Sequence, residues 1–235
     1  MDGGSTDGSV DIIRKYENRL TYWVSEPDKG QADAIYRGFE RSTGEILAWL
    51  NSDDYYLPGT LLAIADFFAR HSKTELLIGN SIVINGNGQE MFRRWAAPVS
   101  FWSLMFWGQM GFHQPASFWR REPFFATGGF DRQLVFCFDL DMCLRLTKRR
   151  PARRINRFLA AFRKHPGTKT TRLEVIRKKE EEIVLNRHGR DRYFPLLART
   201  AKGYYDFTES LRHLQREAKI WARLHVIRNS NSKHE

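Results

Sequence analysis

Leu50-Asn51-Ser52-Asp53-Asp54 follows the apolar run Ile46-Leu47-Ala48-Trp49 and predicts both a strand and a ligand site. The run is short and is opened by Gly44, which predicts a buried strand. Open α/β sheets bind their ligands just beyond the carboxyl ends of such strands, where Asp53 and Asp54 stand. Two adjacent carboxylates repel each other unless a cation lies between them, and their hard oxygens suit magnesium or manganese. The alternative is a simple turn, because Pro58-Gly59 follows closely.

Length and composition predict one packed domain with an appendage. The chain has 235 residues, of which 42% are hydrophobic, enough for a sizeable core. Cys137 and Cys143 are its two cysteines, and without a CxxC pattern they predict reduced thiols, with neither a zinc site nor a disulfide framework. No apolar run is long enough for a transmembrane helix. The polar segment Met1-Asp2-Gly3-Gly4-Ser5 does not resemble a signal peptide.

The positive charge is concentrated in the C-terminal part of the chain. Residues 1–147 hold 14 Lys and Arg against 18 Asp and Glu, whereas residues 148–235 hold 24 against 9. This asymmetry favours an anionic partner, either nucleic acid or an anionic membrane surface. The alternative is a set of well-solvated helices.

Hydrophobic patterning predicts alternating helices and strands. Such alternation is typical of a mostly parallel sheet with helices on both faces. Ser9 is expected to cap the first helix, with Val10, Ile12 and Ile13 facing inward. Helices are predicted over residues 9–16, 30–41, 60–70 and 139–146, strands over 20–24, 46–50 and 76–84, and a hairpin turn over 85–88.

Five segments in chain order resemble the motifs of family 2 glycosyltransferases. They are Asp2-Gly3-Gly4-Ser5-Thr6-Asp7-Gly8-Ser9; residues 25–34; residues 44–54 with Pro58-Gly59; Phe130-Asp131 with residues 138–146; and Arg163-Lys164-His165-Pro166-Gly167. The resemblance implies a Rossmann-like glycosyltransferase A fold, inverting at the anomeric carbon, with a catalytic domain over residues 1–170 and a helical basic extension over 171–235. It also implies that the first strand and helix of the fold are missing. We expect a misassigned start, and a truncated product is the alternative.

The resemblance also implies roles for individual residues. The position of Asp139 is that of the general base, which takes a proton from the acceptor hydroxyl. Asp54 and His165 match the positions that hold a divalent cation, manganese or magnesium. His113 and Gln114 lie where the acceptor pocket is shaped. Nucleotide-sugar contacts are implied for Asp2, Asp28, Lys29, Asp53 and Arg163.

General chemistry supports this arrangement. Inverting sugar transfer is a single displacement, which needs a base on one face and a stabilised leaving group on the other. A departing nucleoside diphosphate needs a metal and cationic side chains. Asp139 and Asp141 are two residues apart, so on a helix they point about 200° apart. Only one of them can face the cleft; the resemblance assigns this place to Asp139, and Asp141 is then free to cap or to pair with Arg145.

Each assignment has a structural alternative. Asp139 can be a helix N-cap, His165 a turn residue and His113 a satisfied structural histidine. Asp28 and Lys29 can form an exposed turn after Pro27. The sequence departs from the family pattern at Phe138, where a glutamate usually precedes the base. Trp102, Phe106 and Trp107 can form a sugar-facing or lipid-facing platform, or can pack in the core.

The C-terminal region lies outside the resemblance. Apolar residues recur at helical spacing between Ser210 and Arg228 among basic ones, which predicts an amphipathic helix that lies on an anionic bilayer or packs on the domain. The sequence therefore favours a metal-dependent inverting glycosyltransferase that moves a sugar from a nucleotide-diphospho-sugar to a saccharide or lipid-linked acceptor. The protein is expected in the cytoplasm, bound peripherally to the inner face of the plasma membrane. The alternative is a non-catalytic remnant or basic binding protein. The sequence carries no recognisable nucleic-acid motif.

Overall fold

The structure is a computed structural model that describes residues 1–108, 112–169 and 173–193. It divides into two compact units, Met1–His188 and Gly189–Glu235. The second unit contributes one described helix, α9 (Arg190–Tyr193). In the described ranges no helix is both long and apolar enough to span a membrane. The predicted helix over 210–228 lies outside the described residues, and the predicted domain boundary at residue 170 stays a prediction.

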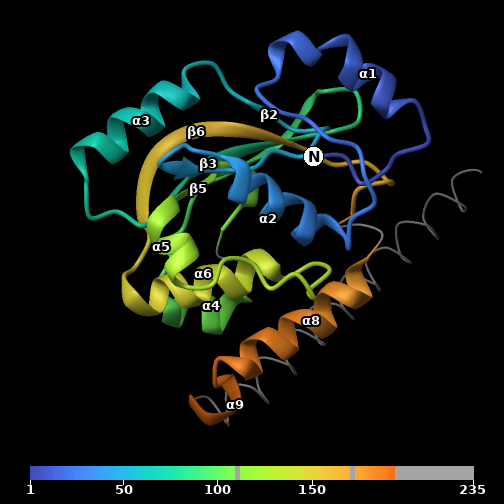
Figure 1. The fold of residues 1–235 in the computed structure, drawn as a ribbon. Helices are drawn as coiled ribbons and strands as arrows, with labels where there is room; N and C mark the ends of the chain where they lie inside the picture. Colours follow the sequence, from blue (N-terminus) through green and yellow to red (C-terminus); the bar gives the residue numbers. More distant parts are fainter. Residues whose placement is uncertain (109–111, 170–172, 194–235) are drawn as a thin grey trace, which may run out of the picture. The chain divides into compact units, whose positions relative to one another are not determined.

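The first unit is an α/β domain built on one six-stranded sheet (Figure 1). The strand order is β1-β5-β3-β6-β2, and β4 pairs with β3. Figure 1 shows α3 on one side of the sheet and α4, α5 and α6 on the other. The strands are β1 (Ile46–Leu47), β2 (Tyr55–Tyr56), β3 (Leu76–Ile84), β4 (Glu90–Arg94), β5 (Ser117–Arg120) and β6 (Arg153–Arg163). The helices are α1 (Ser9–Lys15), α2 (Gln31–Arg41), α3 (Thr60–Arg70), α4 (Phe101–Trp107), α5 (Arg121–Ala126), α6 (Phe138–Arg149) and α8 (Glu174–Arg187), with short 3-10 turns over Glu17–Arg19 and Gln114–Ala116.

The sheet is mixed, so the prediction of a mostly parallel sheet is wrong. Among the described strands, β3 and β6 pair in parallel, whereas β1 with β5, β3 with β5, β3 with β4, and β2 with β6 pair antiparallel. Parallel neighbours need a crossover connection, whereas a tight turn returns the chain antiparallel. The Asn85-Gly86-Asn87-Gly88 turn does this between β3 and β4: Gly88 N–H donates to Asn85 O at 3.0 Å, and Asn85 N–H donates to Gln89 O at 2.9 Å. The hairpin prediction is confirmed.

The strongest sequence patterns give the elements they predict. The helix over residues 60–70 and the strand over 76–84 have the predicted bounds. β3 is almost wholly buried, as expected for a near-continuous apolar run in mid-sheet. α2 begins at Gln31, after Gly30 with φ of 111°. The predicted strand over 20–24 is wrong: in that region the chain makes one isolated parallel bridge, between Asp2 and Ser25.

α1 does not bury the face that the sequence predicts. No residue of this helix is buried, and Ile12 is 63% exposed. Its N-cap is Gly8 rather than Ser9, and the Ser9 hydroxyl donates to Asp7 at 2.7 Å instead. A seven-residue helix presents too few side chains for its pattern alone to define a buried face.

An aromatic core lies behind the end of β1. The Trp49 and Trp119 rings stack with centroids 4.9 Å apart, and Phe130 meets Trp49 edge-on at 5.2 Å. Trp102, Phe106 and Trp107 take no part in this core, being 53%, 38% and 55% exposed. The alternative that these three side chains pack in the core is therefore wrong. Their role as a sugar-facing or lipid-facing platform stays a prediction.

Candidate active site

Asp54 is a buried carboxylate immediately ahead of β2. It follows a tight turn in which its N–H donates to Asn51 O at 3.1 Å. Its Oδ1 accepts the backbone N–H of Arg163 at 2.8 Å, and its Oδ2 accepts Asn51 Nδ2 at 3.1 Å. Burial raises the pKa of Asp54, and the neighbouring Asp53 raises it further, although both hydrogen bonds and the Arg163 charge oppose this. A cation at this position would relieve the unfavourable burial of negative charge.

Asp53 lies beside the segment that follows β6. Its Oδ2 is 3.3 Å from His165 Nε2, and its backbone carbonyl accepts Arg163 Nε at 2.9 Å. The Arg163 guanidinium also donates to Asn85 O at 3.2 Å and to Gly86 O at 3.0 Å. The structure therefore brings together four predicted residues, Asp53, Asp54, Arg163 and His165.

A chain of amide side chains extends from this cluster. Asn51 Nδ2 lies 3.5 Å from Gln114 Oε1, and Gln114 Nε2 donates to Trp49 O at 2.8 Å. Gln31 Nε2 donates to Asn51 Oδ1 at 2.9 Å, and Lys169 Nζ donates to Gln31 Oε1 at 2.6 Å. Gln114 thus lies near the acidic pair, and its predicted contact with the acceptor stays a prediction. Sequence reasoning missed the other three members as site residues; Gln31 stands in one of the five motifs, whereas nothing local marks Lys169.

Asp139 stands in the first turn of α6 and is buried. The N-cap of α6 is Cys137, so the alternative that Asp139 is the N-cap is wrong. Its Oδ1 accepts the N–H of Leu140 at 2.8 Å. Lys169 Nζ donates to Val135 O, just before the helix, and the charge of Asp139 acts to raise the pKa of Lys169 against a larger lowering by burial. The role of Asp139 as a base stays a prediction.

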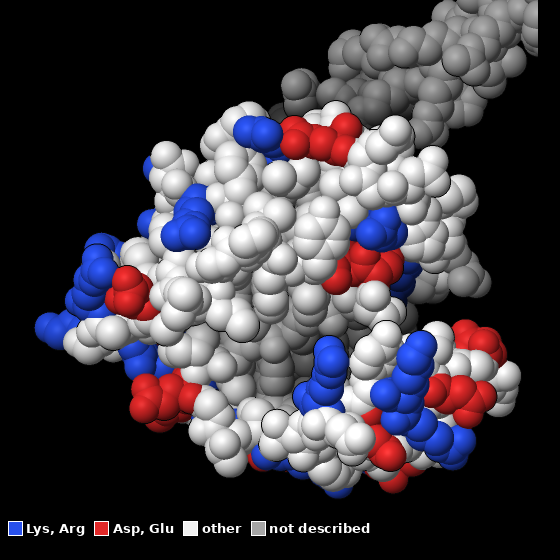
Figure 2. Space-filling model, turned by 90° about the horizontal axis from the view of Figure 1, so that it is seen from above, with Lys and Arg blue, Asp and Glu red and all other residues white. Residues whose placement is uncertain are grey.

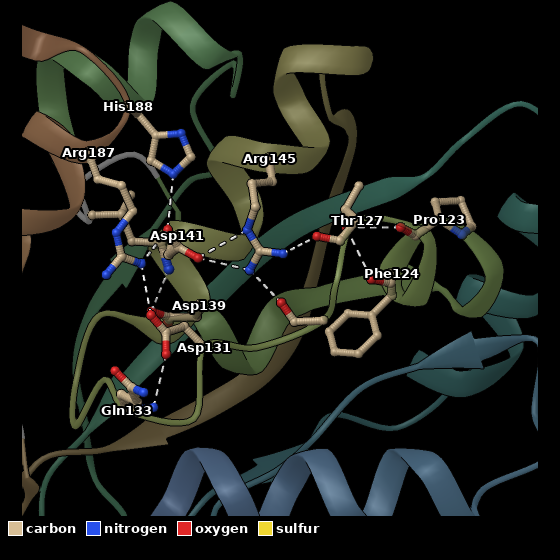
Figure 3. A network of polar contacts seen from close by, with 12 residues as sticks. Pro123, Phe124, Thr127, Asp131, Gln133, Asp139, Asp141, Arg145, Arg187 and His188 are labelled. Carbon is tan, nitrogen blue, oxygen red and sulfur yellow. Dashed lines mark hydrogen bonds and ion pairs between the residues drawn. The ribbon is translucent and has the colours of Figure 1, made fainter.

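Asp141 lies in a polar network with Arg145, Arg187 and His188, and Figure 3 draws Asp139 close by. Its Oδ2 accepts Arg145 Nη2 at 2.8 Å, as the sequence predicts, and its Oδ1 lies 3.0 Å from His188 Nε2 and 3.4 Å from Arg187 Nη1. Arg145 also donates to the carbonyls of Thr127 and Gly129. Burial raises the pKa of Asp141, but the hydrogen bond from His188 and the charge of Arg145 outweigh it and hold the pKa below 3.8.

The N-terminal predicted residues form turns of their own. The Asp2 carboxylate accepts the hydroxyls of Ser25 and Ser5 at 2.7 and 2.6 Å and the N–H of Ser5 at 2.9 Å. These bonds hold its pKa well below the usual range. Asp28 accepts the N–H of Gly30 at 2.7 Å. Lys29 is exposed, and it lines a cavity of about 330 Å³ with Phe130, Asp131, Arg132 and Gln133.

His113 has the surroundings of a neutral, structural histidine. Its Nδ1 shares a hydrogen bond with Ser81 Oγ, and its ring packs edge-on against Phe162 with centroids 5.0 Å apart. Burial, together with the nearby charge of Arg94, lowers the pKa of His113 to about 3. Its acceptor role stays a prediction, and a neutral ring could serve there only through hydrogen bonds or contact.

The cluster of Asp53, Asp54, Arg163 and His165 suits a cation whose coordination is completed by a substrate phosphate. Among the described residues, no group of three or more His, Cys, Asp and Glu side chains is arranged to hold a metal ion. Magnesium-type sites often use one or two carboxylates and complete their shell with water and substrate phosphates. Asp53 and His165 supply an oxygen and a nitrogen 3.3 Å apart, with the buried Asp54 next in the chain. This donor set also suits manganese.

Comparison with known proteins identifies the class. Residues 1–155 match the family model described as Glycosyl transferase family 2, and the chain belongs to that family. The resemblance to this family is thereby confirmed; the fifth motif, residues 163–167, lies beyond the matched range.

Relatives and solved structures agree on this class. A Mycobacterium bovis protein named PGL/p-HBAD biosynthesis glycosyltransferase is 31% identical over 149 residues, which cover 62% of this chain and 56% of that protein. The chain thus spans about half the length of the curated relatives it matches. The S. aureus TarS 1–349 structure in complex with UDP-GlcNAc has a TM-score of 0.58 and 18% identity, over 83% of this chain and 62% of that one. The Pyrobaculum calidifontis mannosyltransferase PcManGT, in complex with GDP-Man and Mn²⁺, has a TM-score of 0.52 and 16% identity, over 78% and 52%. The glycosyltransferase A fold is confirmed.

Proposed function

We propose that this chain carries the donor site and the general base of a metal-dependent, inverting glycosyltransferase that uses a nucleotide-diphospho-sugar. One observation carries the proposal. Asp53, Asp54, Arg163 and His165 come together from positions about 110 residues apart, at 2.8 to 3.3 Å. Membership of the family supports the same activity.

The cluster suits a leaving diphosphate. Asp54 and His165, together with a substrate phosphate, would hold manganese or magnesium, which when bound neutralises the charge that develops on the departing phosphate. Arg163 lies within the same cluster and adds a fixed positive charge. Its guanidinium is held by three backbone carbonyls, those of Asp53, Asn85 and Gly86, so it needs little reorganisation during the reaction.

Asp139 is the proposed base. It would take the proton from the acceptor hydroxyl while that oxygen attacks the anomeric carbon from the face opposite the diphosphate, which inverts the configuration. Asp141 is committed to Arg145 and His188, so the two carboxylates have separate tasks. Gln114 and His113 are proposed to contact the acceptor, and Asp2, Asp28 and Lys29 are proposed to contact the donor.

The proposed acceptor is a saccharide or lipid-linked saccharide of a bacterial cell-surface glycolipid or polysaccharide. The M. bovis relative, whose name refers to PGL/p-HBAD biosynthesis, supports this. A lipid-linked acceptor suits an enzyme that lies peripherally at the cytoplasmic face of the plasma membrane, and the basic C-terminal part suits anionic lipid.

A basic binding protein without catalysis is the competing function. The face in Figure 2 carries Lys and Arg beside Asp and Glu around its rim, rather than a continuous basic surface. A nucleic-acid binder would instead gather its cations into a patch or stripe. The charge distribution on this face therefore favours the enzyme.

Release of nucleoside diphosphate from UDP-GlcNAc, GDP-mannose and other nucleotide-sugars, with Mn²⁺ and with EDTA, tests the proposal. We expect turnover of at least one donor, lost with EDTA and in Asp54→Ala. Asp66→Ala is the matched control, because Asp66 is exposed on α3 and pairs with Arg70. Neither donor binding nor turnover in the wild type, or full activity in Asp54→Ala, would contradict it.

A further inference from the structure

Glu180 of α8 binds the backbone just ahead of α6. Its Oε1 accepts the N–H of Val135 at 2.7 Å. Its Oε2 accepts the N–H of Phe136 at 2.7 Å and that of Cys137 at 2.9 Å. One carboxylate thus holds three consecutive peptide groups from a point more than 40 residues away in the chain.

These peptides lead directly into the helix that carries Asp139. The first N–H groups of a helix lack partners within it, and a side chain at the N-cap usually supplies one. The N-cap of α6, Cys137, makes no such side-chain bond. Glu180 instead accepts the N–H of Cys137 itself and those of the two residues ahead of it, and its negative charge lies at the positive end of the helix dipole. It therefore fixes the backbone that leads into α6, and with it the position of Asp139, two residues after Cys137.

α8 holds the same segment at a second point. Arg187 Nη1 donates to Asp131 Oδ2 at 2.8 Å and lies 3.4 Å from Asp141 Oδ1 (Figure 3). From the other side, Lys169 Nζ donates to Val135 O. The segment 131–137, which also lines the 330 Å³ cavity through Asp131 and Gln133, is thus bound at both ends by charged side chains that come later in the chain.

We propose that Glu180 is a positioning residue for Asp139, and that α8 is therefore part of the active site. The inference rests on the proposed function, since it needs Asp139 to be the base. It extends the site beyond the catalytic domain of residues 1–170 predicted from the sequence; like Arg163 and His165, Glu180 also lies outside residues 1–155, the part that matches the family. Because Glu180 would act through Asp139, the proposed base, it should affect the chemical step rather than the binding of the donor.

The test compares Glu180→Ala and Glu180→Gln with Glu182→Ala in the full chain. Glu182 is an exposed glutamate on the same helix and is the matched control. Misplacing a catalytic group by about 1 Å can cost about 100-fold in rate. We expect kcat of nucleotide-sugar turnover to fall by about 10- to 100-fold in Glu180→Ala, with KM for the donor nearly unchanged. Glu180→Gln keeps an accepting oxygen and should fall between Glu180→Ala and the wild type.

Hydrogen exchange gives a second readout. The amides of Val135, Phe136 and Cys137 should be protected in the wild type and in Glu182→Ala, and should exchange faster in Glu180→Ala. Glu180→Gln, being isosteric, carries the kinetic test if Glu180→Ala does not fold. An unchanged kcat in both Glu180 variants, beside a wild type that needs Asp139, would overturn the inference alone. A wild type without donor turnover would overturn the proposed function and, with it, the inference.

Discussion

Replacing Asp141 with Ala should destabilise the domain strongly. The side chain is 3% exposed and pairs with Arg145 at 2.8 Å and with His188 at 3.0 Å. Removing one partner of a buried ion pair typically costs about 3–5 kcal/mol, because the opposite charge stays buried without compensation. Arg145 would keep its bonds to Thr127 O and Gly129 O and is 25% exposed. We therefore expect the low end, about 3 kcal/mol, or about 6–12 °C in Tm for a domain of this size.

The effect should depend on pH with a definite sign. The pKa of Asp141 lies lower in the folded protein than its usual 3.8. A carboxylate of this kind contributes stability above its unfolded pKa of about 3.9, and the contribution is lost as pH falls through the folded value. The difference in unfolding free energy between wild type and Asp141→Ala should thus be full at pH 7 and shrink below about pH 4.

Urea unfolding followed by tryptophan fluorescence measures both quantities. The control is Asp66→Ala, which removes an exposed i,i+4 pair with Arg70 at 2.8 Å and should cost about 0.3–0.5 kcal/mol. A loss in Asp141→Ala no larger than in this control would refute the reasoning. So would a loss that stays the same at pH 3 and pH 7.

Three further predictions concern single sites. Asp54→Ala should lower Mn²⁺-dependent donor turnover by about 100-fold or more; unchanged stimulation by Mn²⁺ would exclude Asp54 as a ligand. Cys137 and Cys143 are buried, and burial raises the pKa of both thiols. A thiol reagent should therefore modify neither cysteine in the native protein and both in urea. Fast modification of the native protein would contradict this. Gly79→Ala should cost about 1–3 kcal/mol in urea unfolding, because an added Cβ would lie 2.7 Å from Leu159 Cγ; wild-type stability would show that β3 and β6 can separate there.

Local patterns predicted α3 and β3 well, because a long periodic or continuous apolar run leaves few alternatives. Local patterns did not predict whether neighbouring strands pair parallel or antiparallel. β1 pairs antiparallel with β5 through Ile46 and Arg120, residues far apart in the chain whose partnership leaves no local signal. The predicted strand after Leu20 also failed, since β propensity counts only when a neighbouring strand is available to pair.

The same contrast between local patterns and long-range contacts applies to the candidate site. The five motifs predicted Asp53, Asp54, Arg163 and His165, and these residues meet. Lys169 reaches Gln31 across 138 positions and stands in no motif. Glu180 reads in the sequence as one of three consecutive glutamates on a charged helix. Its function-related contacts follow from packing of α8 on α6, which no local pattern encodes.

The rate of nucleoside diphosphate release by Asp139→Asn, at saturating donor with Mn²⁺ and acceptor, tests the central claim most directly. Asparagine keeps the shape of the side chain but cannot take the proton, so we predict a rate lower by at least about 100-fold, with donor binding by calorimetry unchanged. A rate equal to that of the wild type would contradict the assignment of Asp139 as the base.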